Sequence, residues 1–256
     1  MSIDSARLAY VGHATIGMAL DGVRILTDPV IRRRVVHLYR YALPPDPRWL
    51  TPPDAILISH LHLDHCDIPS LRRIGSSTRL IVPRGAGIVF TRHGFRTVEE
   101  LAPGESTMVG PVSVTATPAA HSGFRPPSGP NAIPLGYLIT GSRRLYFAGD
   151  TDLFPAMADL AAGLDVALLP VWGWGRTLGT GHLDPHRAAE ALRLLRPRLA
   201  IPIHWGTYAR VGLVGRMPSF LTEPPHLFTE EAARLAPDVP VRIVQPGEEI
   251  DLGVLD

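Results

Sequence analysis

The 256-residue sequence predicts an α/β fold, built as one layered domain over residues 1–256. Short apolar segments with strand character alternate with helical segments, and the order of these segments in the first half recurs in the second. Histidine or aspartate follows several of the strands. An apolar share of 45% is enough for a sizeable core at this length, so we expect a compact protein.

The first half predicts a hairpin followed by buried strands. Residues 7–20 and 23–27 are apolar and β-prone, and Asp21-Gly22 between them is a strong signal for a two-residue turn. Residues 54–59 form a short apolar run after two prolines, which is typical of a fully buried strand. After a helical turn region, residues 79–83 supply the next core strand.

The second half predicts five more strands and the best helix. Residues 112–119 alternate valine with small polar residues, residues 135–140 and 144–148 flank Gly141-Ser142, and residues 165–171 form another buried run. Residues 185–195 have apolar residues at helical spacing. Asp184 stands at the N-cap position, Pro185 at the first turn and Pro197 beyond the end, and residues 199–203 read as a final strand.

The two halves share an order of features, which predicts an internal duplication. Each half has a hairpin turn, then a residue pair ending in aspartate, then an aspartate before a buried strand: Asp21-Gly22, Thr27-Asp28 and Asp54 in the first half, and Gly141-Ser142, Gly149-Asp150 and Asp165 in the second.

The segment Ser-His-Leu-His-Leu-Asp-His at residues 59–65 is the clearest chemical signal. It puts three imidazoles and a carboxylate directly after a buried strand, and first-row divalent metals prefer these ligands. In an extended segment His60 and His62 point the same way, while Asp64 and His65 lie just beyond them. The segment therefore predicts a metal site with room for a second, neighbouring ion.

Three further residues complete the predicted site. His121, Asp150 and His204 each stand just past the C-terminal end of a predicted strand, as His60 does. In open α/β sheets these ends form the crevice in which chemistry is assembled. We therefore expect seven candidate ligands to converge.

Composition excludes several other functions. Every one of the 25 Lys and Arg residues is arginine, and without a lysine amine the chain has no Schiff base, pyridoxal phosphate or P-loop chemistry. A single cysteine, Cys66, excludes an internal disulfide framework, and we expect it to pack as a small apolar group. The net charge of +1 argues against nucleic acid as a partner. With no apolar run of membrane-spanning length and no secretory signal, the expected location is the cytoplasm.

These residues resemble the metallo-β-lactamase fold superfamily of hydrolases, through its HxHxDH motif and the later histidine, Gly-Asp and final histidine. The resemblance implies a four-layer αβ/βα sandwich of two mixed β-sheets with an internal duplication. It also implies that one divalent ion is held by His60, His62 and His121 and a second by Asp64, His65 and His204, with Asp150 as the bridge. Zinc is the first expectation, and manganese or iron also suit these ligands.

Further segments are similar to the branch that contains N-acyl-phosphatidylethanolamine phospholipase D and ascorbate-6-phosphate lactonase. They are Gly12-His13-Ala14-Thr15, Thr27-Asp28-Pro29, Ala148-Gly149-Asp150-Thr151, Gly181-His182-Leu183-Asp184-Pro185, Ile203-His204-Trp205-Gly206-Thr207 and Glu223-Pro224-Pro225. True β-lactamases carry a cysteine ligand where this chain has Asp150, which argues against a β-lactam substrate.

The implied mechanism uses two ions about 3.5–4 Å apart, which share a water, lower its pKa and leave hydroxide beside an electrophile. Asp64 is a candidate to hydrogen-bond this hydroxide. His182 precedes the predicted helix, where it either caps the helix or contacts substrate, and the resemblance favours a substrate contact or proton donor. His13 and Asp28 either orient ligand imidazoles or are ordinary structural residues.

The expected substrate is a small-molecule or lipid-like anion, and oligomeric state is left open. The first candidate substrate is a phosphodiester, which includes phospholipid-like molecules. The alternative substrate is the lactone of a phosphorylated sugar. A di-iron redox protein and a noncatalytic metal-binding protein are the alternatives from other classes. Two segments either hold an anionic group over the metals or are solvated surface: Arg32-Arg33-Arg34 and Trp172–Arg176.

Overall fold

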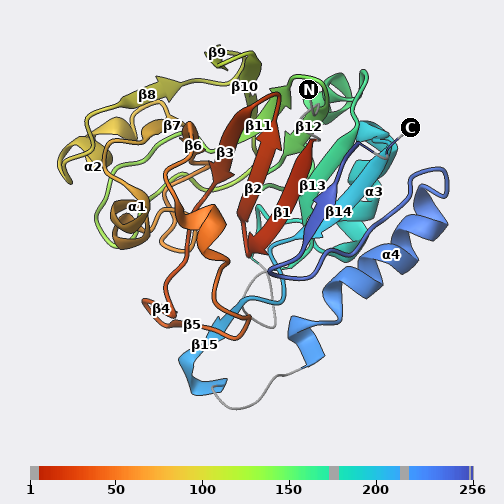
Figure 1. Cartoon of the computed structure of the whole chain (residues 1–256). Helices are drawn as coiled ribbons and strands as arrows, with labels where there is room; N and C mark the ends of the chain where they lie inside the picture. Colours follow the sequence, from red (N-terminus) through yellow and green to blue (C-terminus); the bar gives the residue numbers. More distant parts are fainter. Residues whose placement is uncertain (1–5, 173–178, 214–218, 254, 256) are drawn as a thin grey trace.

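The computed structural model describes residues 6–172, 179–213, 219–253 and 255. Two mixed β-sheets face each other, and helices lie on their outer sides (Figure 1). The predicted αβ/βα sandwich is therefore confirmed. No helix within the described ranges is long and apolar enough to cross a membrane.

The first sheet has seven strands and opens with the predicted hairpin. Its antiparallel part is followed by strands that pair in parallel. The spatial order is β16 (Glu249–Asp251), β1 (Arg7–Gly12), β2 (Thr15–Leu20), β3 (Val23–Thr27), β6 (Ala55–Leu57), β7 (Arg79–Pro83) and β8 (Val98–Leu101).

The second sheet has six strands. Its spatial order is β14 (Leu199–Ile203), β13 (Val166–Pro170), β12 (Arg144–Phe147), β11 (Leu135–Thr140), β10 (Val112–Pro118) and β9 (Ser106–Val109). Strands β12, β13 and β14 are parallel, and the others pair antiparallel. The run β10-β11-β12-β13-β14 thus repeats the order and sense of β1-β2-β3-β6-β7, as the predicted duplication requires.

Alternation along the strands divides the core into layers. In β6 and β7, Leu57 and Ile81 face the space between the sheets, whereas Ile56 and Leu80 face α1 (Ile68–Ile74) and α2 (Gly87–Thr91). Helices α3 (Pro185–Leu195) and α4 (Pro224–Leu235) pack on the outer side of the second sheet. Each sheet therefore buries both of its faces, which explains the nearly continuous apolar strands.

Helix α3 has the predicted bounds, and its ends show why. The Asp184 carboxylate accepts a hydrogen bond of 2.8 Å from the Arg187 N–H, which caps the first turn. Pro185 needs no hydrogen-bond partner for its nitrogen at this position. Arg196 then adopts a left-handed backbone with φ of 45°, and Pro197 prevents any continuation of the helix.

Two expectations about strands need correction. Residues 7–20 are two strands, because the chain turns back at His13 and Ala14, where His13 has a φ of 60°. An apolar run does not reveal such a turn. A third sheet of β15 (Tyr208–Arg210), β5 (Leu38–Arg40) and β4 (Arg34–Val35) was not predicted either, since its strands are short and rich in arginine. Within the described residues the chain also forms four short 3-10 helices: η1 (Pro47–Leu50), η2 (Pro155–Leu160), η3 (Val211–Leu213) and η4 (Ser219–Leu221).

Candidate metal centre

All seven predicted site residues converge at the C-terminal ends of the strands. Residues 60–65 occupy the loop between β6 and α1, whereas His121, Asp150 and His204 follow β10, β12 and β14. The ligand atoms of His60, His62 and His121 lie within 4.8 Å of one another, and those of a second group do the same: His13, Asp64, His65 and His204.

Asp150 lies between the two groups. Its Oδ2 is 3.2 Å from Nε2 of His65 and 4.0 Å from Nε2 of His121, and its Oδ1 is 3.3 Å from Nε2 of His204. Gly149 makes this approach possible, because it has a φ of 61° and an added Cβ would lie 2.7 Å from the Cβ of Ser59. One carboxylate therefore reaches both candidate metal positions.

Four of the candidate ligand rings are fixed through Nδ1. Asp28 accepts from His65 over 2.8 Å, Ser59 Oγ from His60 over 2.9 Å, and the Gly181 carbonyl from His121 over 2.7 Å, while the Trp172 carbonyl accepts from His204. With Nδ1 protonated, the lone pair is on Nε2, the nitrogen that faces the centre. This is the usual arrangement around metal-binding histidines.

Backbone strain concentrates at the same place. His13, Asp28 and His204 all adopt positive φ values, of 60°, 34° and 65°, which are rare for residues other than glycine. The His204 N–H donates to the His13 carbonyl over 2.8 Å, and the His13 N–H donates to Thr207 Oγ1 over 2.8 Å. The surrounding structure thus holds both turns in conformations that cost energy, as at many functional sites.

The chemistry of the cluster fits divalent metals. His60 Nε2 is buried and has no hydrogen-bond partner among the described residues. Two pairs of ring nitrogens face each other, with His62 Nδ1 and His121 Nε2 3.1 Å apart and the Nε2 atoms of His65 and His204 3.0 Å apart. Converging nitrogen lone pairs beside a carboxylate are a cradle for a cation.

The charges of His62, His204 and Asp150 suit ligands, whereas His65 holds a proton more tightly than an ordinary histidine. Burial lowers the pKa of His62 to about 4 and that of His204 to about 3, so these imidazoles are neutral at pH 7. Burial raises the pKa of Asp150, but the nearby imidazoles, His204 and His65 foremost, outweigh it and hold the pKa well below its usual range. Burial lowers the pKa of His65, yet the charge of Asp150 and the hydrogen bonds to Asp150 and Asp28 raise it well above its usual value.

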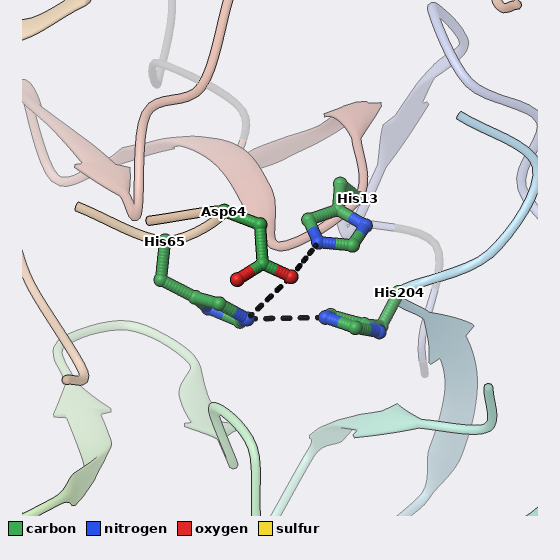
Figure 2. Close-up of side chains that lie close together, drawn as sticks. All are labelled: His13, Asp64, His65 and His204. Atoms are coloured by element: carbon green, nitrogen blue, oxygen red, sulfur yellow. Dashed lines mark hydrogen bonds and ion pairs between the residues drawn. The ribbon is translucent and has the colours of Figure 1, made fainter. Parts of the chain in front are cut away.

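His13 contacts a carboxylate, which is neither of the two roles, orienting an imidazole or serving as an ordinary structural residue, that the sequence left open for it. Its Nε2 lies 3.2 Å from Asp64 Oδ2, and its ring centroid is 3.8 Å from that of His204 (Figure 2). Asp28, the other residue left open, does orient an imidazole, that of His65. Both are therefore part of the centre.

His182 faces the centre and does not cap the helix, because Asp184 performs that role. Its Nε2 is 3.6 Å from Asp150 Oδ2, and its ring lies 4.6 Å from that of His121. Its side chain is 26% exposed, which is more than the candidate ligand Asp150 at 4%. His182 therefore stands on the open side of the cluster.

The two segments suggested for anion binding have different outcomes. Arg32 donates from Nε and one Nη to the two carboxylate oxygens of Asp67, over 2.8 and 2.6 Å, so this edge of its guanidinium is already occupied. Arg33 and Arg34 are exposed. In the second segment Trp172 is buried, whereas residues 173–178 lie outside the described residues. Cys66 is buried and its pKa is raised to about 12 by burial, which confirms that it packs as an apolar group.

Several orienting groups were missed in the sequence. Ser59 directly precedes the motif, and a hydroxyl side chain at that position could have been predicted to contact a ligand histidine. Thr207 Oγ1 supports His13 and is part of the His-Trp-Gly-Thr segment, but its partner is 194 residues away in the chain. The carbonyls of Gly181 and Trp172 carry no side-chain signal at all.

Residues 23–205 match the profile of the Beta-lactamase superfamily domain. A UPF0173 metal-dependent hydrolase from Opitutus terrae is 34% identical over 256 residues, covering 96% of this chain and 100% of the relative. The chain belongs to the metal-dependent hydrolases of the beta-lactamase superfamily. The seven converging residues thus lie in a fold that other hydrolases share.

Two further similarities bear on the site. The N-acyl-phosphatidylethanolamine-hydrolyzing phospholipase D 1 of Caenorhabditis elegans is 32% identical over 225 residues, covering 78% of this chain and 63% of the relative. The metallo hydrolase Igni18 from the archaeon Ignicoccus hospitalis superposes with a TM-score of 0.73 at 26% identity, covering 96% of this chain and 97% of that one.

Proposed function

We propose that the chain is a hydrolase of phosphodiesters that works with two divalent metal ions. His60, His62 and His121 would hold one ion, and Asp64, His65 and His204 the other. The observation that carries this proposal is the position of Asp150, whose two oxygens lie near ring nitrogens of both groups. Such ions, zinc first and manganese or iron as alternatives, lower the pKa of bound water and polarise the oxygen of an electrophile.

Three side chains at the proposed metal centre would position the water and the leaving group. His13 holds the Asp64 carboxylate through a contact of 3.2 Å, which places Asp64 to accept a hydrogen bond from the attacking water. His182 stands on the open side, within 3.6 Å of Asp150, where a leaving group would emerge. We assign to its Nε2 the delivery of a proton to that group, a role in which histidine is the commonest side chain.

The substrate class is supported by the donor set and by one relative. Because Asp150 supplies oxygen where β-lactamases have a thiolate, every candidate ligand atom in this chain is nitrogen or oxygen. The similarity to a phospholipase that hydrolyses N-acyl-phosphatidylethanolamine favours a lipid-like phosphodiester over a β-lactam. The anionic phosphate would lie against the metal pair.

Metal analysis and a substrate panel test the proposal together. The protein as isolated is analysed for metal by plasma mass spectrometry, and the same preparation is given bis(p-nitrophenyl) phosphate, a phospholipid, a sugar-phosphate lactone and a β-lactam. We expect two ions per chain and turnover of the diesters. The variant His60→Ala should lose metal and activity. His93 is an exposed histidine just after the end of α2, and His93→Ala should keep both.

The outcomes separate the parts of the proposal. Turnover of the sugar-phosphate lactone without turnover of either diester would contradict the substrate class and leave the metal assignment standing. A chain that binds no divalent ion, yet keeps its fold, would contradict the metal assignment as well.

A further inference from the structure

The small third sheet forms a distinct lobe at the rim of the candidate metal centre. We define the arginine lobe as residues 29–45 and 205–212, which contain β4, β5 and β15. Its first segment begins directly after Asp28 and its second directly after His204. The lobe projects from the body at the lower edge of the molecule (Figure 1).

Tyr208 anchors the lobe to the centre. Its hydroxyl donates to the Arg32 carbonyl over 2.6 Å and lies 3.2 Å from the Val30 carbonyl, which ties the two segments together. Its ring meets that of His13 edge-on, with 5.6 Å between centroids. The lobe is therefore packed directly against a residue of the candidate metal centre.

The lobe is richer in basic side chains than the rest of the chain. It carries five of the chain's 25 basic side chains and none of its 24 acidic ones, although the whole chain has a net charge of only +1. Arg32 is neutralised by Asp67, and Arg40 is buried against the Val11 and Leu43 carbonyls. Arg33, Arg34 and Arg210 are exposed.

Part of this charge is held in position on the surface. The Arg33 guanidinium lies 5.1 Å from the centroid of the Tyr39 ring, and its Nε donates to the Tyr39 hydroxyl over 2.5 Å. Arg34 Nε donates to the Val36 carbonyl over 3.2 Å. Among the described residues, no carboxylate forms an ion pair with Arg33 or Arg34.

An apolar residue stands at the tip between these charges. Val36 is 54% exposed at the turn that joins β4 to β5, and it has a φ of 50°. This backbone conformation is rare for a β-branched residue and costs conformational energy, which a glycine at this position would avoid. Leu43, elsewhere in the lobe, is 79% exposed.

We propose that the arginine lobe docks the protein on an anionic lipid surface. Arginines near such a surface are attracted by its negative potential, and a short apolar tip can enter the headgroup boundary. A nucleic acid would match the arginines but gives no reason for an exposed valine at the tip. The inference deepens the proposed function, because it names the place where a lipid-like phosphodiester is met.

Vesicle binding tests the proposal with a matched control. The full chain is floated with phosphatidylcholine vesicles with and without about a third phosphatidylglycerol. We expect binding only to the anionic vesicles, and a loss of binding at high salt, which screens charge. The variant Arg33→Gln/Arg34→Gln should lower the partition coefficient by roughly tenfold or more, because each arginine near the surface contributes appreciably.

The control removes the same charge elsewhere. Arg72 and Arg73 are also an adjacent, exposed pair, in the last turn of α1, and Arg72→Gln/Arg73→Gln should bind vesicles like the wild type. A further variant, Val36→Asp, should weaken binding without removing a positive charge. Weakening by the α1 variant equal to that of the lobe variant, or wild-type binding to neutral vesicles as strong as to anionic ones, would overturn the proposal.

Two additional measurements keep the alternatives apart. An RNA oligonucleotide that binds with the same dependence on Arg33 and Arg34, while anionic vesicles do not bind, would overturn the choice of partner. Hydrolysis of soluble bis(p-nitrophenyl) phosphate by the wild type requires no vesicle, so its absence would count against the proposed function and not against the lobe.

Discussion

The two halves of the molecule share a frame but supply chemistry differently. In both, an aspartate before a buried strand accepts the backbone N–H of an arginine: Asp54 from Arg24 over 2.7 Å, and Asp165 from Arg144 over 2.8 Å. The first half then gives four candidate ligands from one loop, whereas the second gives one from each of three strand ends. The repeat therefore fixes positions in space, and each half fills them in its own way.

The contrast is sharpest around the His65 ring. Asp28, after β3 in the first half, lies 2.8 Å from Nδ1, and Asp150, after β12 in the second half, lies 3.2 Å from Nε2. Asp28 also accepts from the Ser59 N–H over 2.7 Å and from its hydroxyl, so its carboxylate is fully used in positioning. One aspartate thus orients a ring, while the other is turned toward the candidate metals.

Loss of the inward aspartate should have the largest effect. Asp150→Asn keeps the shape but removes the charge shared by the two groups of ligands. We expect kcat/KM for a phosphodiester to fall by roughly a thousandfold or more, since several kcal/mol of charge stabilisation are lost. Bound metal should fall as well. Circular dichroism gives the fold control, and full activity with full metal content would refute the bridging role.

Loss of the orienting aspartate should have a smaller effect. In Asp28→Asn the amide favours the wrong tautomer of His65, and such partners of metal-binding histidines usually contribute 10–100-fold in metal affinity. Competition with a chromophoric chelator measures this affinity directly. Ser59→Ala is the matched variant, because it keeps the Asp28 carboxylate and its contact with His65 and removes only the hydroxyl that contacts Asp28 and His60. Equal affinities in Asp28→Asn and wild type would mean that Asp28 only supports the fold.

The two halves also differ in what their sequences reveal. The loop of residues 60–65 is local, so its spacing alone predicts a metal site. His121, Asp150 and His204 become a site only when the strands are placed side by side, and their positions just past the ends of predicted strands supplied that step. The bounds of β7, β14 and α3 were predicted correctly, because buried strands are continuous apolar runs and α3 has clear caps.

Other features lie beyond such patterns. The turn at His13 interrupts an apolar run, and no glycine or proline follows Gly12 there to indicate a turn. The turn depends instead on Thr207, which lies 194 residues away in the chain. His121 and His204 are fixed by backbone carbonyls, a group that every residue has and that no sequence pattern therefore marks. Tertiary contacts decide these features, and one sequence does not display them.

His182 allows a comparison between the centre and the surface of α3. His182→Gln should lower kcat by about a hundredfold, because general acid catalysis contributes on the order of 10²–10⁴. Metal content should not change, as all seven candidate ligands remain. His186→Gln is the control, because His186 is exposed and pairs with Glu231 on α4, 2.9 Å away. Metal loss in His182→Gln would reassign this residue as a ligand.

Substitution of the two aspartates at matching positions in the halves, Asp54 and Asp165, should have the smallest effect, and this effect should be on stability alone. Asp165→Ala removes the acceptor of the Arg144 N–H, a partly buried hydrogen bond, and should lower the free energy of unfolding by about 1–2 kcal/mol. Asp54→Ala removes the matching bond at an exposed site, where water replaces the carboxylate, and should cost about 0.5 kcal/mol. Urea unfolding measures both, and kcat should be unchanged in each. A larger cost for Asp54→Ala would show that the frame of the first half, which holds the motif loop, depends more on this contact than its exposure indicates.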